Sequence, residues 1–187
     1  MDKILYIDST ARENSRTRVL SDHLLSKLDG SVTHLYLYDE DLPTLCGETL
    51  MHRSECAAKK DFSDARFRFA KQFAEADEIV IAAPYWDNSF PAILKKYIET
   101  ISVCNLTFEY TPDGRAIGLC AAKKLYYVTT SGGYVSDIYG YGYISELAKT
   151  MYGIPETFLF KAEGLDIAGA DVDAILSEAK RKIDRIV

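Results

Sequence analysis

Apolar residues recur along the chain in two patterns, one typical of β-strands and the other of amphipathic helices. The clearest strand is the continuous apolar run at residues 79–83, as expected for a strand buried on both faces. The predicted strands cover residues 3–8, 31–38, 79–83, 124–130 and 157–161. The predicted helices cover residues 15–28, 62–76, 91–102, 143–152 and 170–186.

Periodicity and turn residues refine several of these segments. Pro91 opens the helix after the third strand, where its missing N–H costs nothing. Residues 39–60 form a long connection with room for a short helix, and residues 106–119 predict a hairpin around a Thr-Pro-Asp-Gly turn. The residues expected near one face of the first helix are Val19, Leu20, His23, Leu24 and Leu28.

The order of the elements predicts the fold class. Strand and helix alternate five times, which indicates a parallel sheet with helices on both faces. Five strands suit the doubly wound order 2-1-3-4-5 better than the six strands of a dinucleotide-binding fold. A length of 187 residues fits one domain, so we expect a single α/β domain over residues 1–187.

Composition and charge exclude several classes of protein. A net charge of −6 argues against nucleic acid or an anionic membrane as the main partner. No apolar run reaches the roughly 18–20 residues that a spanning helix needs, and the N-terminus reads as a strand rather than a signal peptide. Cys46, Cys56, Cys104 and Cys120 lack metal-binding or redox spacing. We therefore expect a cytoplasmic protein with free thiols and no metal.

Three loops are expected to carry the chemistry. In open α/β sheets, ligands bind beyond the carboxyl ends of the strands, at the topological switch point. The loops after the first, third and fourth predicted strands meet at that edge. They cover residues 9–17, 84–91 and 129–134.

The first of these loops has the composition of a phosphate site. Hydroxyl residues and two arginines, Arg12 and Arg16, stand in the turn that opens a helix. The free N–H groups and the dipole of a helix N-terminus favour an anion there, and the arginines add charge-assisted hydrogen bonds. The loop has no glycine, so both the dinucleotide fingerprint and the Walker A pattern are absent. The alternative is a solvated helix cap with surface arginines.

The other two loops suit a flat ring. Tyr85 and Trp86 follow the third strand, and aromatic side chains are the usual contacts of an uncharged ring system. Gly132 and Gly133 follow the fourth strand and allow a ligand to approach the backbone closely. The alternatives are that Trp86 covers the end of the sheet and that the glycines form a simple turn.

These segments resemble the flavodoxin-like NAD(P)H dehydrogenases, a family that includes FMN-dependent NADH azoreductases and quinone reductases. The most specific match is Ala-Pro-Tyr-Trp at residues 83–86 followed by Phe-Pro-Ala-Ile-Leu-Lys at residues 90–95. The hairpin around residues 107–119, the loop at residues 130–133 and Tyr-Gly-Ile at residues 152–154 are also similar to the family. The resemblance covers most of the chain.

The resemblance implies a flavodoxin-like fold, bound FMN, NADH or NADPH as electron donor, and a homodimer. The residues that would hold the phosphate are Ser9, Ser15, Arg16 and Thr17. The residues that would surround the ring are Pro84, Tyr85, Trp86, Asp87, Thr130, Ser131, Gly132 and Gly133. Arg12 and Asn88 of the same loops complete the candidate set.

The implied activity is the reduction of a quinone, an azo compound or a related small electron acceptor. A nicotinamide would pass hydride to the flavin, and the acceptor would then occupy the same space, in a ping-pong reaction. No catalytic side chain is expected, because solvent or a tyrosine can supply the proton. Two positions depart from the family: a carboxylate at Asp87, which would oppose negative charge on a reduced ring, and Ser131 in place of an arginine.

Two other functions fit parts of the pattern. The first is a flavodoxin-type electron carrier, or another flavin-binding protein, that does not react with nicotinamide directly. The acidic composition suits a carrier, but the chain lacks the Thr-Gly-Asn-Thr kind of phosphate loop. The second is a non-enzymatic switch such as a receiver domain. A receiver needs an aspartate at the end of the third strand, where this chain has Ala-Ala-Pro at residues 82–84.

Overall fold

The computed structural model describes residues 1–187 and is built around a parallel sheet of five strands. The strands follow the order β2-β1-β3-β6-β7. Their bounds are β1 Asp2–Asp8, β2 Gly30–Tyr36, β3 Glu78–Ala82, β6 Lys124–Thr130 and β7 Glu156–Ala162. Because β4 and β5 form a separate hairpin, this is the doubly wound order 2-1-3-4-5, and the predicted fold class is confirmed.

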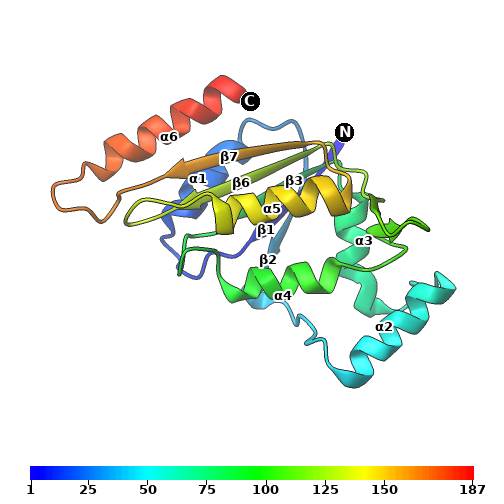
Figure 1. Ribbon diagram of the computed structural model, residues 1–187. Helices are drawn as coiled ribbons and strands as arrows, with labels where there is room; N and C mark the ends of the chain where they lie inside the picture. The colour runs from blue at the N-terminus through cyan, green and yellow to red at the C-terminus, as the bar shows by residue number, and fades with distance from the viewer.

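Helices cover both faces of the sheet, and one helix extends away from it (Figure 1). The helix α2 projects beyond the body of the sheet in that view. Short π-helical segments, Ile138–Gly142 and Ala148–Tyr152, flank α5. The helices are α1 Arg16–Leu25, α2 Gly47–Lys59, α3 Arg68–Glu75, α4 Ala92–Ile101, α5 Tyr143–Leu147 and α6 Val172–Ile186.

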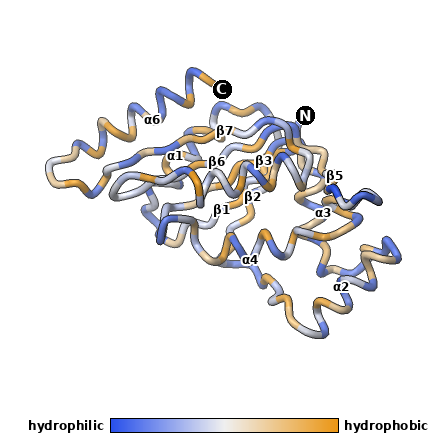
Figure 2. Tube along the Cα trace, viewed as in Figure 1, coloured by the Kyte–Doolittle hydropathy of each residue, from blue (hydrophilic) through white to orange (hydrophobic).

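The alternation of side chains along each strand divides the core in two. In β3, Ile79 and Ile81 point into a cluster shared with α3, α4 and α5, whereas Val80 and Ala82 point into a cluster shared with α1 and α6. Since side chains of a strand alternate between its faces, one continuous apolar run fills both clusters. Figure 2 shows this apolar character concentrated along the central strands.

The hairpin of β4 (Phe108–Tyr110) and β5 (Ala116–Gly118) lies at the opposite end of the sheet from the carboxyl ends of its strands (Figure 1). Its polar tip stands out in Figure 2. A Cβ atom added at Gly118 would overlap the backbone at Gly153, where φ is +76°. The two glycines therefore let the hairpin dock directly on the chain between α5 and β7.

The first helix differs from the prediction in its end and in one face residue. It ends at Leu25 rather than residue 28, because Lys27 and Leu28 donate i→i−3 bonds to Leu24 and Leu25 in a tightened last turn. Leu20 and Leu24 are buried as expected, but Val19 is 44% exposed, so its placement on the apolar face was wrong. Val19 precedes Leu20 by one residue, about 100° around the helix, and so points away from the sheet.

The segment before the third strand also differs. The predicted short helix in the connection is the 13-residue α2, which begins where the Cys46 N–H donates to Thr49 Oγ1 at 2.9 Å. The next helix begins at Arg68 rather than residue 62. Asp61 accepts from the N–H of Ser63, and Asp64 from the N–H of Arg66, and such local bonds compete with helix formation.

The length and apolar character of the helices decide whether any of them could span a membrane. None of them is both long enough and apolar enough to pass through a bilayer.

The two neighbouring residues Leu20 and Val19 make a matched test of this packing. We expect Leu20→Ala to lower the free energy of unfolding by about 2–5 kcal/mol, because it leaves a cavity between α1 and the sheet. Val19→Ala should change it by about 0.5 kcal/mol or less. Urea denaturation followed by circular dichroism measures both. Equal losses would contradict the assigned face of α1.

Candidate functional site

The carboxyl ends of β1, β3, β6 and β7 are joined by backbone hydrogen bonds that continue past the strands. The Ser9 N–H donates to the Ala82 carbonyl at 2.9 Å, the Tyr85 N–H to the Thr130 carbonyl at 3.0 Å, and the Ser131 N–H to the Ala162 carbonyl at 3.0 Å. These bonds bring the loop after each strand against the loop of its neighbour. The three loops singled out in the sequence therefore lie together, with the loop after β7 added to them.

The loops enclose a cleft of about 340 Å³, within the size range of small-molecule sites. The predicted residues that line it are Arg12, Ser15, Arg16, Thr17, Pro84, Tyr85, Trp86, Thr130, Ser131 and Gly132. The predicted residues outside the lining are Ser9, Asp87, Asn88 and Gly133. The lining also includes Ala11 and Asn14, which belong to the predicted loop 9–17 but not to the candidate set, and Leu165 and Asp166, which lie outside all three predicted loops.

The start of α1 forms one end of the cleft. Ser15 caps the helix and its hydroxyl accepts from the Arg18 N–H at 3.3 Å. The N–H groups of Arg16 and Thr17 lie in the first turn, where the helix offers them no acceptor. Thr17 Oγ1 lies 2.6 Å from Thr130 Oγ1 and ties this turn to the end of β6. The arrangement presents backbone donors, hydroxyls and arginines to the cleft, which suits an anion.

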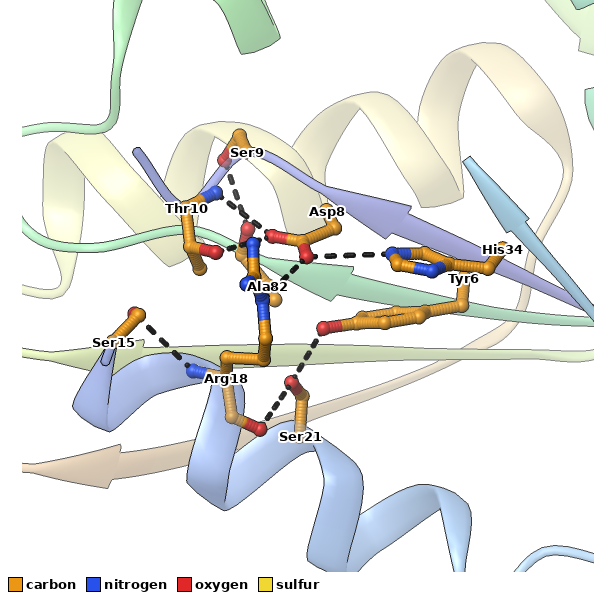
Figure 3. Close-up of polar contacts among 9 residues, drawn as sticks. All are labelled: Tyr6, Asp8, Ser9, Thr10, Ser15, Arg18, Ser21, His34 and Ala82. Atoms are coloured by element: carbon orange, nitrogen blue, oxygen red, sulfur yellow. Dashed lines mark hydrogen bonds and ion pairs between the residues drawn. The ribbon is translucent and has the colours of Figure 1, made fainter. Parts of the chain in front are cut away.

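A buried carboxylate holds the loop that leads into this helix (Figure 3). Asp8 Oδ1 accepts from the N–H of Thr10 at 2.8 Å and from its hydroxyl at 2.6 Å. Asp8 Oδ2 accepts from Arg18 Nε at 2.9 Å and lies 3.3 Å from His34 Nε2. Ser9, beside it, donates its hydroxyl to the Ala82 carbonyl at 2.8 Å and is fully buried beneath the loop.

Aromatic and hydroxyl groups complete this network from below. Tyr6 stacks on His34 with ring centroids 4.6 Å apart, and its hydroxyl lies 2.8 Å from Ser21 Oγ (Figure 3). Burial raises the pKa of the Tyr6 hydroxyl well above its ordinary value, so the group stays protonated and keeps its hydrogen bond. The side chains around Asp8 thus compensate a charge that would be costly to bury alone.

The loop after β3 is a tight turn that carries the aromatic wall of the cleft. Trp86 and Ser89 exchange N–H to carbonyl bonds, and Asp87 and Asn88 between them have φ of +49° and +63°. Two positive φ values define a type I′ turn, which asparagine and aspartate tolerate well. The turn exposes both side chains to solvent. The Tyr85 hydroxyl accepts from the Ser136 N–H at 3.1 Å, which fixes this wall from the far side.

The loops after β6 and β7 pair with each other to form the remaining wall. The N–H groups of Gly164, Leu165 and Asp166 donate to the carbonyls of Gly133, Ser131 and Gly132, respectively. Asp166 lies so close that a Cβ atom at Gly132 would overlap its carboxylate. Across the cleft, Arg16 forms a 2.8 Å ion pair with the same carboxylate. The predicted strand order already placed β7 beside β6. That order was the available signal that the loop after β7, which contains Asp166, lies beside the cleft.

Comparisons with known proteins agree with this geometry. The flavodoxin-like fold family matches residues 2–187. The chain is 38% identical to the FMN-dependent NADH:quinone oxidoreductase 2 of Clostridium acetobutylicum, over 97% of this chain and 96% of that protein.

Solved structures share the fold at lower identity. An azoreductase from Bacillus anthracis superposes with a TM-score of 0.84 at 23% identity and covers 100% of this chain and 98% of its own. An FMN-dependent NADH-azoreductase from the same species, solved in complex with FMN, superposes with a TM-score of 0.78 at 20% identity, over 100% and 99% of the two chains.

The family match spans nearly the whole chain, and the curated relative is similar over almost its full length. The chain therefore belongs to the flavodoxin-like fold family, among the relatives of the FMN-dependent NADH:quinone oxidoreductases.

Proposed function

We propose that this protein binds FMN in the cleft and catalyses the reduction of quinone, azo or related small acceptors by NADH or NADPH. One observation carries the proposal. The cleft brings the N-terminus of α1, whose free N–H groups suit an anion, and an aromatic wall into one continuous space, as a phosphorylated planar ring requires. Relatives named as FMN-dependent NADH:quinone oxidoreductases match 96–97% of the chain.

The residues present fit the phosphate of FMN. Ser15, Arg16 and Thr17 would hold it through backbone N–H groups and hydroxyls, and the guanidinium of Arg12 would add charge from the rim. Ser9 would support the loop from beneath, since its own hydroxyl is donated to Ala82. The dipole of the ten-residue helix α1 favours the same anion.

The aromatic and glycine loops fit the ring. Pro84, Tyr85 and Trp86 would pack along it, and Thr130, Ser131 and Gly132 would form the opposite wall. The N–H groups of Tyr85 and Trp86 are already donated within the protein. Those of Asp87 and Asn88 at the turn have no protein acceptor, but both residues lie outside the cleft lining.

FMN supplies the redox chemistry, since a flavin accepts hydride from a nicotinamide and passes electrons to a second substrate. The protein orients the ring, limits its access to water and leaves its outer face open near Trp86. Asp87 projects to solvent in this turn, which keeps its carboxylate out of the cleft lining. We also propose a cytoplasmic location, because all four cysteines are free thiols.

A homodimer is part of the proposal. Tyr134 and Tyr139 are 81% and 61% exposed, and Ile138 beside them is also exposed. Ser89 donates its hydroxyl to the Tyr139 carbonyl at 3.0 Å, so this apolar patch adjoins the Trp86 turn. Exposed apolar patches of this kind commonly mark interfaces. A second copy of the chain would cover the patch and close the outer side of the cleft.

The central test is spectroscopic and kinetic. We expect the purified protein to bind FMN, to show flavin absorbance bands, and to lose them when NADH or NADPH is added without oxygen. With a quinone or azo acceptor, double-reciprocal plots should be parallel, as ping-pong kinetics require. A protein that stays colourless with added FMN contradicts the proposal. A bound flavin that neither nicotinamide reduces would instead indicate the electron carrier.

The aromatic wall can be tested at Trp86. We expect Trp86→Ala to weaken FMN binding about fivefold, which corresponds to about 1 kcal/mol for a lost aromatic contact. Trp86→Phe keeps an aromatic face and should stay within about twofold of the wild type. Quenching of flavin fluorescence on titration with protein measures both. If Trp86→Ala binds FMN like the wild type, the ring does not lie on this wall.

The proposed dimer can be tested by a charge in the exposed patch. We expect a dimer at micromolar concentration for the wild type and a monomer for Tyr139→Glu, because an interface would bury the new carboxylate without a partner. Tyr110→Glu is the matched control, since Tyr110 is a similarly exposed tyrosine on the distant hairpin. Sedimentation velocity distinguishes the two states. A monomeric wild type would refute the dimer.

A further inference from the structure

Arg16, a proposed phosphate ligand, is already paired with a carboxylate of the same cleft. Its Nη1 donates to Asp166 Oδ1 at 2.8 Å, and the Leu165 carbonyl lies 3.5 Å from the same nitrogen. The Arg16 and Asp166 side chains are 42% and 71% exposed. The pair therefore lies at the mouth of the cleft, within reach of solvent and of a ligand.

The backbone fixes where this carboxylate lies. The Asp166 N–H donates to the Gly132 carbonyl at 3.0 Å, and the Leu165 N–H to the Ser131 carbonyl at 3.1 Å. Leu165 is buried in the core, which anchors the loop. Gly132 leaves the space that a Cβ atom would take from the carboxylate. Asp166 is thus held against the cleft by three uncharged residues, Ser131, Gly132 and Leu165, and Arg16 is its only ion-pair partner.

A phosphate monoester carries a charge of about −1.5 to −2 near neutral pH and, like a carboxylate, accepts hydrogen bonds from guanidinium groups. While Asp166 accepts from Arg16 at 2.8 Å, its carboxylate offsets part of the guanidinium charge, so Arg16 attracts a phosphate less strongly. Asp166 also adds a negative charge to the wall of the cleft. Both effects weaken binding of the phosphate, and neither changes binding of the rest of the flavin.

We propose that Asp166 accepts from Arg16 in competition with the cofactor phosphate. The inference rests on the proposed FMN site. Asp166 then sets how strongly the cleft prefers a phosphorylated flavin over riboflavin, the same ring without phosphate. The loop after β7 thereby becomes part of the cofactor specificity of the site, beside the three loops that line it from β1, β3 and β6.

The test compares FMN and riboflavin binding to the full-length, flavin-stripped protein by fluorescence quenching. We expect Asp166→Asn to tighten FMN binding about fivefold, the range of an exposed ion pair, and to leave riboflavin binding within about twofold. Asp113→Asn is the matched control, because Asp113 pairs with Arg115 at 2.8 Å on the distant hairpin. It should change neither affinity.

A second variant separates sharing of Arg16 from simple repulsion by Asp166. In an Arg16→Gln background, Asp166→Asn should lose most of its effect on FMN, since interacting residues show coupling in a double-mutant cycle. Thermal unfolding of each variant shows that it is folded.

Four results would overturn the inference: unchanged or weaker FMN binding by Asp166→Asn, an equal shift for riboflavin, the full effect without Arg16, or no FMN binding by the wild type. The last alone also refutes the proposed function.

Discussion

The parallel direction of all five strands is the constraint on which the rest of the molecule depends. Because β1, β3, β6 and β7 end at one edge, the first residues of loops that are far apart in the chain meet there. The backbone bonds from Ser9 to Ala82 and from Tyr85 to Thr130 continue the sheet into the loops. The cleft therefore lies where the sheet places the starts of these loops, and the loops add the chemistry and, after β6 and β7, further pairing of their own.

The glycine-free loop after β1 shows how a charged residue can organise the turn that we propose to bind the phosphate. Phosphate loops commonly use glycine to let the chain turn sharply. Here Asp8 accepts two bonds from Thr10 and pairs with Arg18, so the side chain fixes the turn that glycine would otherwise permit. The buried charge is acceptable because the carboxylate has partners from α1, from β2 and from the loop itself.

Several features could be predicted from the sequence, and there are physical reasons why others could not. The run at residues 79–83 and the strand at residues 124–130 are clear because strands buried on both faces contain few polar residues. Val19 was misplaced because periodicity alone leaves the edge of a helical face undefined. Asp166 could not be recognised by composition, since its place in the cleft comes from pairing between two loops more than 30 residues apart.

The docked glycines of the hairpin have a practical consequence. Gly118 and Gly153 fasten the base of the hairpin to the body of the protein, whereas nothing lies within 4 Å of the Cβ position at Gly114 near its tip. The tip also lies at the end of the sheet opposite the carboxyl ends of its strands (Figure 1), where the cleft residues are. A peptide epitope inserted at that tip would be displayed on a firm base. The protein could also be tethered to a sensor surface through the tip, with the opening of the cleft directed away from the surface.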